Sequence, residues 1–205
     1  MPTGTIQQVA SVGGLSIQSS IQRTSTGGIG HDPVLPAANA GNLTTRTNDT
    51  DGELTLGADH GITDGQEINI FWTDVDGVKH CAYGATVGTV AGVAVPFTGA
   101  AGDVLPADEY AVTASVVVEI DTDFDGDLLE MISAGSTLLT HIAFRTVAPA
   151  VIKAVLLLPN EGWSWVSKQG IINPLAGELV DHVYASNGDA SAATTLKIGV
   201  NYNST

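Results

Sequence analysis

Hydrophobic residues alternate with polar residues along several stretches of this chain, and the period of two limits the possible folds more than any other feature. The alternating stretches are residues 67–73, 112–120, 138–145 and 195–202. Because successive side chains of a β-strand point to opposite faces, this pattern is typical of strands with one apolar face. In residues 138–145 both alternating sets contain apolar residues, so we expect that strand to be covered on both sides.

The remaining apolar segments are short. The run 150–158 lies between Pro149 and Pro159, and its β-branched residues favour a strand over a short helix. Helical turns are expected only over 127–132 and 176–183, which are too short to be stable without tertiary packing. The 24 glycines and 8 prolines fall mostly between the alternating stretches, where they supply turns. The sequence therefore predicts an all-β protein.

The pattern along the chain predicts three parts. Residues 1–40 form an extended N-terminal arm rich in Gly, Ser and Thr, which we expect a neighbouring subunit to order. Residues 41–111 contain short strands with frequent turn signals, as in a small β-barrel-like domain. Residues 112–205 have longer strands, as in an antiparallel β-sandwich.

Charge and cysteine content exclude several classes of protein. The chain carries 22 acidic and 7 basic residues, a formal charge of -15. Such a surface repels phosphate and anionic lipid, so neither nucleic acid nor a membrane is an expected partner. The single cysteine cannot form an intramolecular disulfide, and no apolar stretch reaches the roughly 20 residues of a membrane-spanning helix. Residues 1–20 lack Lys and Arg, so no secretory signal is expected.

An acidic segment gives the strongest chemical motif. Asp121, Asp123, Asp125 and Asp127 alternate around Gly126, as in the first half of a calcium loop. The closing Glu of a twelve-residue loop is replaced by Ile132. We therefore favour a solvated hairpin turn and keep a calcium site as the alternative. The Asp-x-Asp-Gly segments at 49–52 and 74–77 are explained by turns alone.

The sequence contains no motif for zinc, nucleophilic or phosphate chemistry, whereas a carboxylate pair for glycoside hydrolysis is defined by separation in space and is not decided by the sequence. The five histidines lack the spacing of a zinc site, and there is no nucleophile elbow or phosphate-binding glycine loop. An enzymatic role is therefore not expected, and no catalytic residue is predicted. Trp163 and Trp165 are two residues apart and would share one face of a strand. Together with Trp72 they are candidates for a subunit interface or, alternatively, for stacking against sugars.

Several segments resemble a module of tailed-bacteriophage proteins. The similarity covers about residues 40–112 and rests on Gly65 and five segments: 43–47 (LTTRT), 52–56 (GELTL), 60–62 (HGI), 83–90 (YGATVGTV) and 99–106 (GAAGDVLP). The resemblance implies a virion structural protein and assigns no functional residue.

These observations lead to a functional hypothesis. We expect a non-enzymatic capsid decoration or cement subunit on the capsid exterior, which binds the major capsid protein and neighbouring copies of itself. A homo-oligomer is expected, and the resemblance implies a trimer, because subunits of that kind usually bind at three-fold junctions. The alternatives are a calcium-assisted carbohydrate-binding or host-facing adhesion module, and a structural component of the tail or head-tail connector.

Overall fold

The described part of the chain is built from β-strands. The computed structural model describes residues 6–9, 18–21, 34–121, 131–135, 138–146, 151–159, 161–164 and 182–201. These residues contain no α-helix, and thus none with the length and apolarity that a membrane crossing requires. The predicted all-β class is confirmed.

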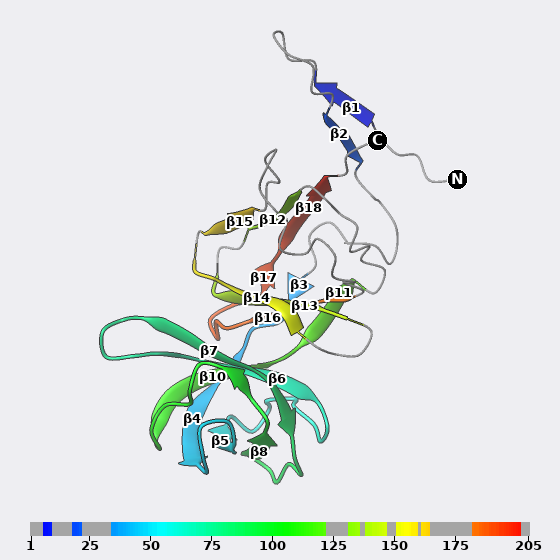
Figure 1. The fold of residues 1–205 in the computed structure, drawn as a ribbon. Helices are drawn as coiled ribbons and strands as arrows, with labels where there is room; N and C mark the ends of the chain where they lie inside the picture. Colours follow the sequence, from blue (N-terminus) through cyan, green and yellow to red (C-terminus); the bar gives the residue numbers. More distant parts are fainter. Residues whose placement is uncertain are drawn as a thin grey trace.

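Six antiparallel strands form a closed barrel at one end of the molecule (Figure 1). They are β4 (Asn39–Arg46), β5 (Gly52–Leu56), β6 (Glu67–Thr73), β7 (Lys79–Val87), β8 (Ala94–Thr98) and β10 (Tyr110–Val116). Their order is β6-β10-β4-β5-β8-β7, and the pairing of β7 with β6 closes the ring. The short β9 (Ala101–Gly102) pairs with Ala82 and Tyr83 of β7, along the same edge of β7 that pairs with β8.

The barrel encloses the main apolar core. On β6, Ile68, Ile70 and Trp72 are all buried in it, as the alternation predicts. The other fully or nearly fully buried members include Leu43, Leu54, Ala82, Ala85, Val95, Phe97, Leu105 and Ala114.

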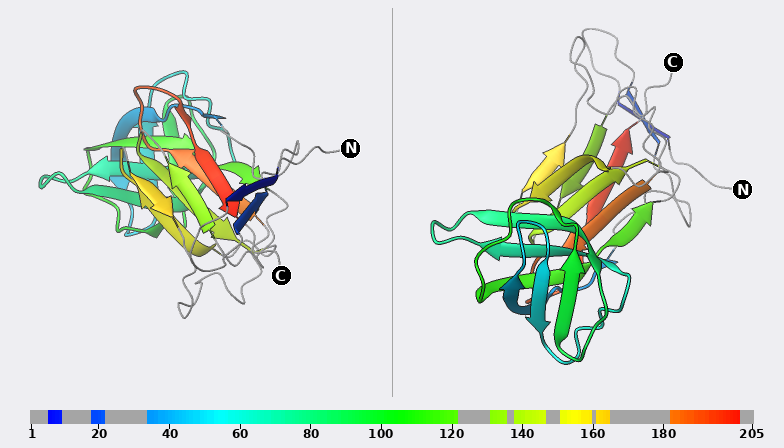
Figure 2. Two further views of the ribbon diagram at one scale, coloured as in Figure 1. Left: turned by 90° about the horizontal axis from the view of Figure 1, so that it is seen from above. Right: turned by 60° about the horizontal axis from the view of Figure 1, so that its bottom comes forward.

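The second part of the molecule contains two further sheets (Figure 2). The larger has the order β11 (Val118–Asp121), β16 (His182–Asn187), β13 (Thr140–Arg145) and β14 (Val151–Leu157). The smaller has the order β15 (Gly162–Ser164), β12 (Met131–Gly135) and β18 (Lys197–Asn201). Two short pairs complete the described strands: β3 (Val34–Leu35) with β17 (Thr194–Thr195), and β1 (Ile6–Val9) with β2 (Gln18–Ile21).

One predicted strand belongs to two sheets. Residues 112–120 are interrupted at Val117: β10 pairs with β4 and β6 in the barrel, whereas β11 pairs with β16 in the larger sheet. The boundary predicted after residue 111 therefore falls inside β10, and the barrel extends to Val116. Alternation alone does not reveal this change of sheet, because the residues keep the same period through it.

Other local predictions have mixed outcomes. Within the run 150–158, residues 151–157 form strand β14, and every residue of β13 is buried, so both expectations are confirmed. The expected helical turns are wrong at their C-terminal ends, because residues 131–132 begin β12 and residues 182–183 begin β16. Strand pairing with β18 and with β13 outweighs the weak helical preference of such short segments. The rest of both segments lies outside the described residues.

Candidate functional site

The acidic segment is described only at its first residue. Asp121 ends β11, and Asp123, Asp125 and Asp127 lie outside the described residues. Across the part of the chain that the structure describes, no three His, Cys, Asp or Glu side chains are grouped to hold a metal ion. Calcium binding by this segment stays a prediction.

The three tryptophans have different positions. Trp72 is only 7% exposed and belongs to the barrel core, where its ring stacks on His80 at 5.3 Å between centroids. Little of its surface is left for a partner or a sugar. Trp163 lies in β15 opposite Ala134, and Trp165 lies outside the described residues.

The most elaborate polar arrangement lies between the barrel and the larger sheet. The second face of β6, which carries Glu67, Asn69 and Phe71, is covered by residues of β13 and β16 and by the loop after β16. Alternation predicts a polar outer face here. The structure places that face in a buried layer instead, because the sandwich packs against it.

Asn69 is the centre of a buried hydrogen-bond network. Its Oδ1 accepts a hydrogen bond from the Gly84 backbone N–H at 2.8 Å, which fixes the orientation of the amide. Its Nδ2 therefore donates to Ser186 Oγ at 2.7 Å and to His141 Nδ1 at 3.1 Å. Because His141 Nδ1 accepts, the neutral imidazole carries its proton on Nε2.

The environment of His141 favours its uncharged form. Burial and then the positive charge of Arg145 lower the pKa of His141 to about 4. The ring stacks on Tyr83 at 4.7 Å between centroids. Its Nε2 has no hydrogen-bond partner among the described residues. A cavity of about 160 Å³ is lined in part by His141, but the Nε2 atom itself is buried away from solvent.

The layer between β6 and the larger sheet also contains an ion pair between Arg145 and Glu67. Arg145 of β13 donates from Nη1 to Glu67 Oε2 at 2.7 Å and from Nη2 to Glu67 Oε1. The guanidinium also lies over the Tyr184 ring, 4.4 Å from its centroid. The Arg145 side chain is 6% exposed, and its hydrogen bonds to Glu67 raise its pKa. A bidentate pair of this kind fixes the orientation of the two strands as well as their distance.

Apolar packing completes the layer. Phe71, Cys81 and Leu139 form a buried cluster, and burial raises the pKa of the Cys81 thiol well above its usual value. Gly188 follows β16 where a Cβ would lie 2.7 Å from the Phe71 ring. Only glycine allows this close approach. A nearby hydrogen bond from Thr113 Oγ1 to Gly188 O, at 2.6 Å, links the barrel to the loop after β16.

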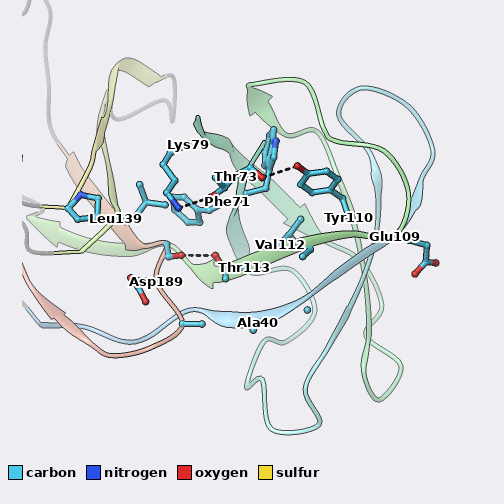
Figure 3. Close-up of a pocket in the computed structure, with 16 residues that line it drawn as sticks. Ala40, Phe71, Thr73, Lys79, Glu109, Tyr110, Val112, Thr113, Leu139 and Asp189 are labelled. Atoms are coloured by element: carbon cyan, nitrogen blue, oxygen red, sulfur yellow. Dashed lines mark hydrogen bonds between the residues drawn. The ribbon is translucent and has the colours of Figure 1, made fainter. Parts of the chain in front are cut away.

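A groove of about 700 Å³ runs along the edge of this junction (Figure 3). Phe71, Tyr110 and Leu139 supply much of its apolar lining. Its polar groups are largely bonded to one another, since Lys79 Nζ donates to Thr73 Oγ1 at 2.6 Å and Tyr110 OH donates to Thr73 O at 2.8 Å. The groove is therefore a feature of the domain junction, and the polar atoms of Lys79, Thr73 and Tyr110 already have partners within the chain.

The two Asp-x-Asp-Gly segments of the barrel lie in turns, but the positive φ predicted for their glycines is found only at Gly77, because Gly52 already begins β5. Asp74 Oδ1 accepts from the backbone N–H groups of Asp76 and Val78, at 3.0 and 2.8 Å, and Gly77 has a φ of 83°. In the turn at 49–52, Asn48 Oδ1 accepts from the N–H groups of Thr50 and Asp51. The N–H of Gly99 donates to Asp51, which lowers the pKa of that carboxyl. These carboxylates serve to hold loops.

Sequence reasoning does not identify Asn69, His141 or Arg145 as important residues. The available signal is a polar residue within an otherwise apolar strand, as at Asn69 between Ile68 and Ile70. Such a residue must find a partner when it is buried. The sequence cannot specify the partner, because His141 is 72 positions away and Ser186 is 117 positions away.

No family model matches the chain, and neither the curated proteins nor the solved structures give a significant match.

Proposed function

We propose that this chain is a non-enzymatic structural subunit of a virion, and most specifically a decoration subunit that adheres to the exterior of a tailed-phage capsid. The β1–β2 hairpin is the observation that carries the proposal. It forms a two-stranded sheet of its own, with four residues paired in each strand. It lies at the opposite end of the molecule from the barrel, next to β18 (Figure 1).

A two-stranded sheet of this size is marginally stable in water. Both of its outer edges are unpaired among the described strands, so each can accept a further strand. Addition of a strand from a neighbouring molecule would satisfy backbone groups and stabilise the hairpin. This is the behaviour required of an arm that is ordered on assembly.

The body of the molecule suits the same role. The buried layer of Asn69, His141 and the Glu67–Arg145 pair holds the barrel and the sandwich in one orientation, so a load applied at one end is transmitted to the other. The charge of -15 keeps free subunits apart in solution. The same charge favours a partner surface that carries Lys and Arg.

Shell melting tests the proposal. Purified chain is mixed with undecorated shells of the phage that encodes it, and the melting temperature of the shells is measured by calorimetry. We expect saturable binding and a raised melting temperature. Absence of both binding and stabilisation would overturn the proposal.

A variant of the arm sharpens this test. Ser20 pairs with Gln7 in the hairpin. Ser20→Pro removes the backbone N–H of this residue and fixes its φ angle, whereas Ser20→Ala keeps the N–H and leaves φ free. We expect Ser20→Pro to weaken shell binding and Ser20→Ala to bind as the wild type does. Equal binding by both variants would show that the hairpin is not a contact.

A further inference from the structure

We propose that the tip of the β6–β7 hairpin, together with the adjoining loop after β9, is a docking surface for an apolar depression whose rim carries Lys and Arg. This inference rests on the proposed function, according to which the depression belongs to the outer surface of the capsid shell. Three valines, Val75, Val78 and Val104, supply the apolar part of the surface, and three carboxylates adjoin them.

The valines are exposed to an unusual degree. Val75 is 92% exposed, Val104 58% and Val78 52%, whereas Val87 and Val95 of the same barrel are buried. Val75 and Val78 lie at the tip of a hairpin that projects beyond the barrel in both views of Figure 2. A projecting apolar tip can enter a depression on a partner without displacing other parts of the chain.

The tip is held in one conformation. Besides the two hydrogen bonds that Asp74 Oδ1 accepts, the Asp74 N–H donates to Val78 O at 2.9 Å and the Gly77 N–H donates to Asp74 O at 3.1 Å. These bonds close the turn on both sides. Docking therefore costs little conformational entropy, because the loop is ordered before the partner arrives.

His80 connects the tip to the loop that carries Val104. Its Nε2 lies 3.1 Å from Asp74 Oδ2 and its Nδ1 lies 3.3 Å from Asp103 Oδ2. Asp103 Oδ2 also accepts from the Cys81 N–H at 3.0 Å. A neutral imidazole has one N–H, so two carboxylate partners are satisfied together only by the imidazolium. The bridge fixes Asp103, and with it Val104, beside the base of the hairpin.

The charges around the valines identify the chemistry of the partner. Asp74 and Asp76 flank Val75, and Asp103 precedes Val104, whereas Val78 lies between Gly77 and Lys79. Lys79, the nearest basic residue in sequence, bonds to Thr73 in the groove. Asp74 and Asp103 are bridged by the His80 imidazolium, so a cationic rim on the partner would face the exposed Asp76. The complementary charge would speed association and select this partner over acidic surfaces.

Co-sedimentation with undecorated shells tests the surface. The variant Val75→Ser/Val78→Ser removes the apolar tip, and Val93→Ser, at an exposed position in another barrel turn, is the matched control. Both should melt as the wild type does, because the side chains are exposed. We expect the double variant to lose at least about tenfold in affinity and the control to stay within about twofold, since each tenfold loss is about 1.4 kcal/mol.

Charge reversal provides a second and independent variant. Asp76→Lys should weaken binding, with a larger effect at low than at high ionic strength, whereas Asp59→Lys on another exposed turn should not. If the wild type binds shells and all four variants bind equally well, the docking surface is wrong and the decoration role stands. If the wild type itself does not bind, both proposals fail.

Discussion

The barrel interior and the layer between barrel and sandwich are both buried, yet they are built from opposite kinds of residue. The interior contains Leu, Ile, Val, Phe and Ala side chains, together with Trp72. The layer contains an asparagine, a histidine and an arginine paired with a glutamate, beside a small apolar cluster. The strand β6 contributes to both, with Ile68 and Ile70 on one face and Glu67 and Asn69 on the other.

The two regions are stabilised by different kinds of interaction. Apolar burial is non-directional, so the barrel interior depends on volume and pattern. A buried polar group contributes only when its partners are correctly placed, so the layer specifies one orientation of the two parts. Four predictions test this distinction, in order of decreasing expected effect.

Truncation in the barrel interior should have the largest effect. Phe97 of β8 is 1% exposed, and Phe97→Ala should lower the free energy of unfolding by about 3 to 5 kcal/mol, because it removes apolar contacts and leaves a cavity. Urea unfolding measures the change, with Val93→Ala on an exposed turn as the control. A loss below about 1 kcal/mol would mean that the interior is less tightly packed than the structure shows.

Acid should weaken the layer through His141. The pKa of this residue is about 4 in the folded chain and 6.5 in its ordinary state. Between these values the unfolded chain binds more protons, so stability falls as the pH falls from 6.5 towards 4, by about 3 kcal/mol in all.

The variant His141→Gln isolates this contribution, because Gln does not titrate. Urea unfolding of both proteins across this pH range should show a steeper acid loss for the wild type than for the variant. Parallel curves would contradict the assignment of His141 as a buried neutral residue.

Loss of the central amide should have an intermediate effect. Asn69→Ala leaves His141 Nδ1, Ser186 Oγ and the Gly84 N–H without that partner. We expect a loss of about 1 to 3 kcal/mol in the free energy of unfolding. Asn42→Ala, at an exposed position of β4, is the control and should be nearly neutral. An equal effect of the two substitutions would remove the distinction between the layer and the surface.

The bridge at His80 should have the smallest effect on stability. Hydrogen bonding to Asp74 raises the pKa of His80 above 6.5. Because this pKa is raised in the folded chain, the bridge contributes fully to the free energy of unfolding below pH 6.5, the ordinary pKa of histidine. The contribution is lost as the pH rises through the pKa that His80 has in the folded chain. The side chain is partly exposed, so His80→Gln should cost about 0.2 to 1 kcal/mol near pH 6 and less near pH 9. A cost that grows with pH would contradict the imidazolium bridge.

The regions also differ in how far the sequence predicts them. Alternation at Ile68, Ile70 and Trp72 predicts the inward face of β6, and Asp-Gly pairs predict the turns, because both signals are local. The buried layer joins Asn69 to residues 72 and 117 positions away, and no local pattern encodes that pairing. The docking surface is likewise not predicted by a local pattern, because only the folded hairpin shows that Val75 is exposed and that His80 links the hairpin to Asp103.

Electron cryo-microscopy of undecorated shells incubated with the chain tests the central claim most directly. The account predicts added density on the outer surface of the shell, repeated with the capsid lattice and present at every equivalent position once the chain is in excess. Shells that remain bare, or density confined to the tail or to the portal vertex, would contradict it.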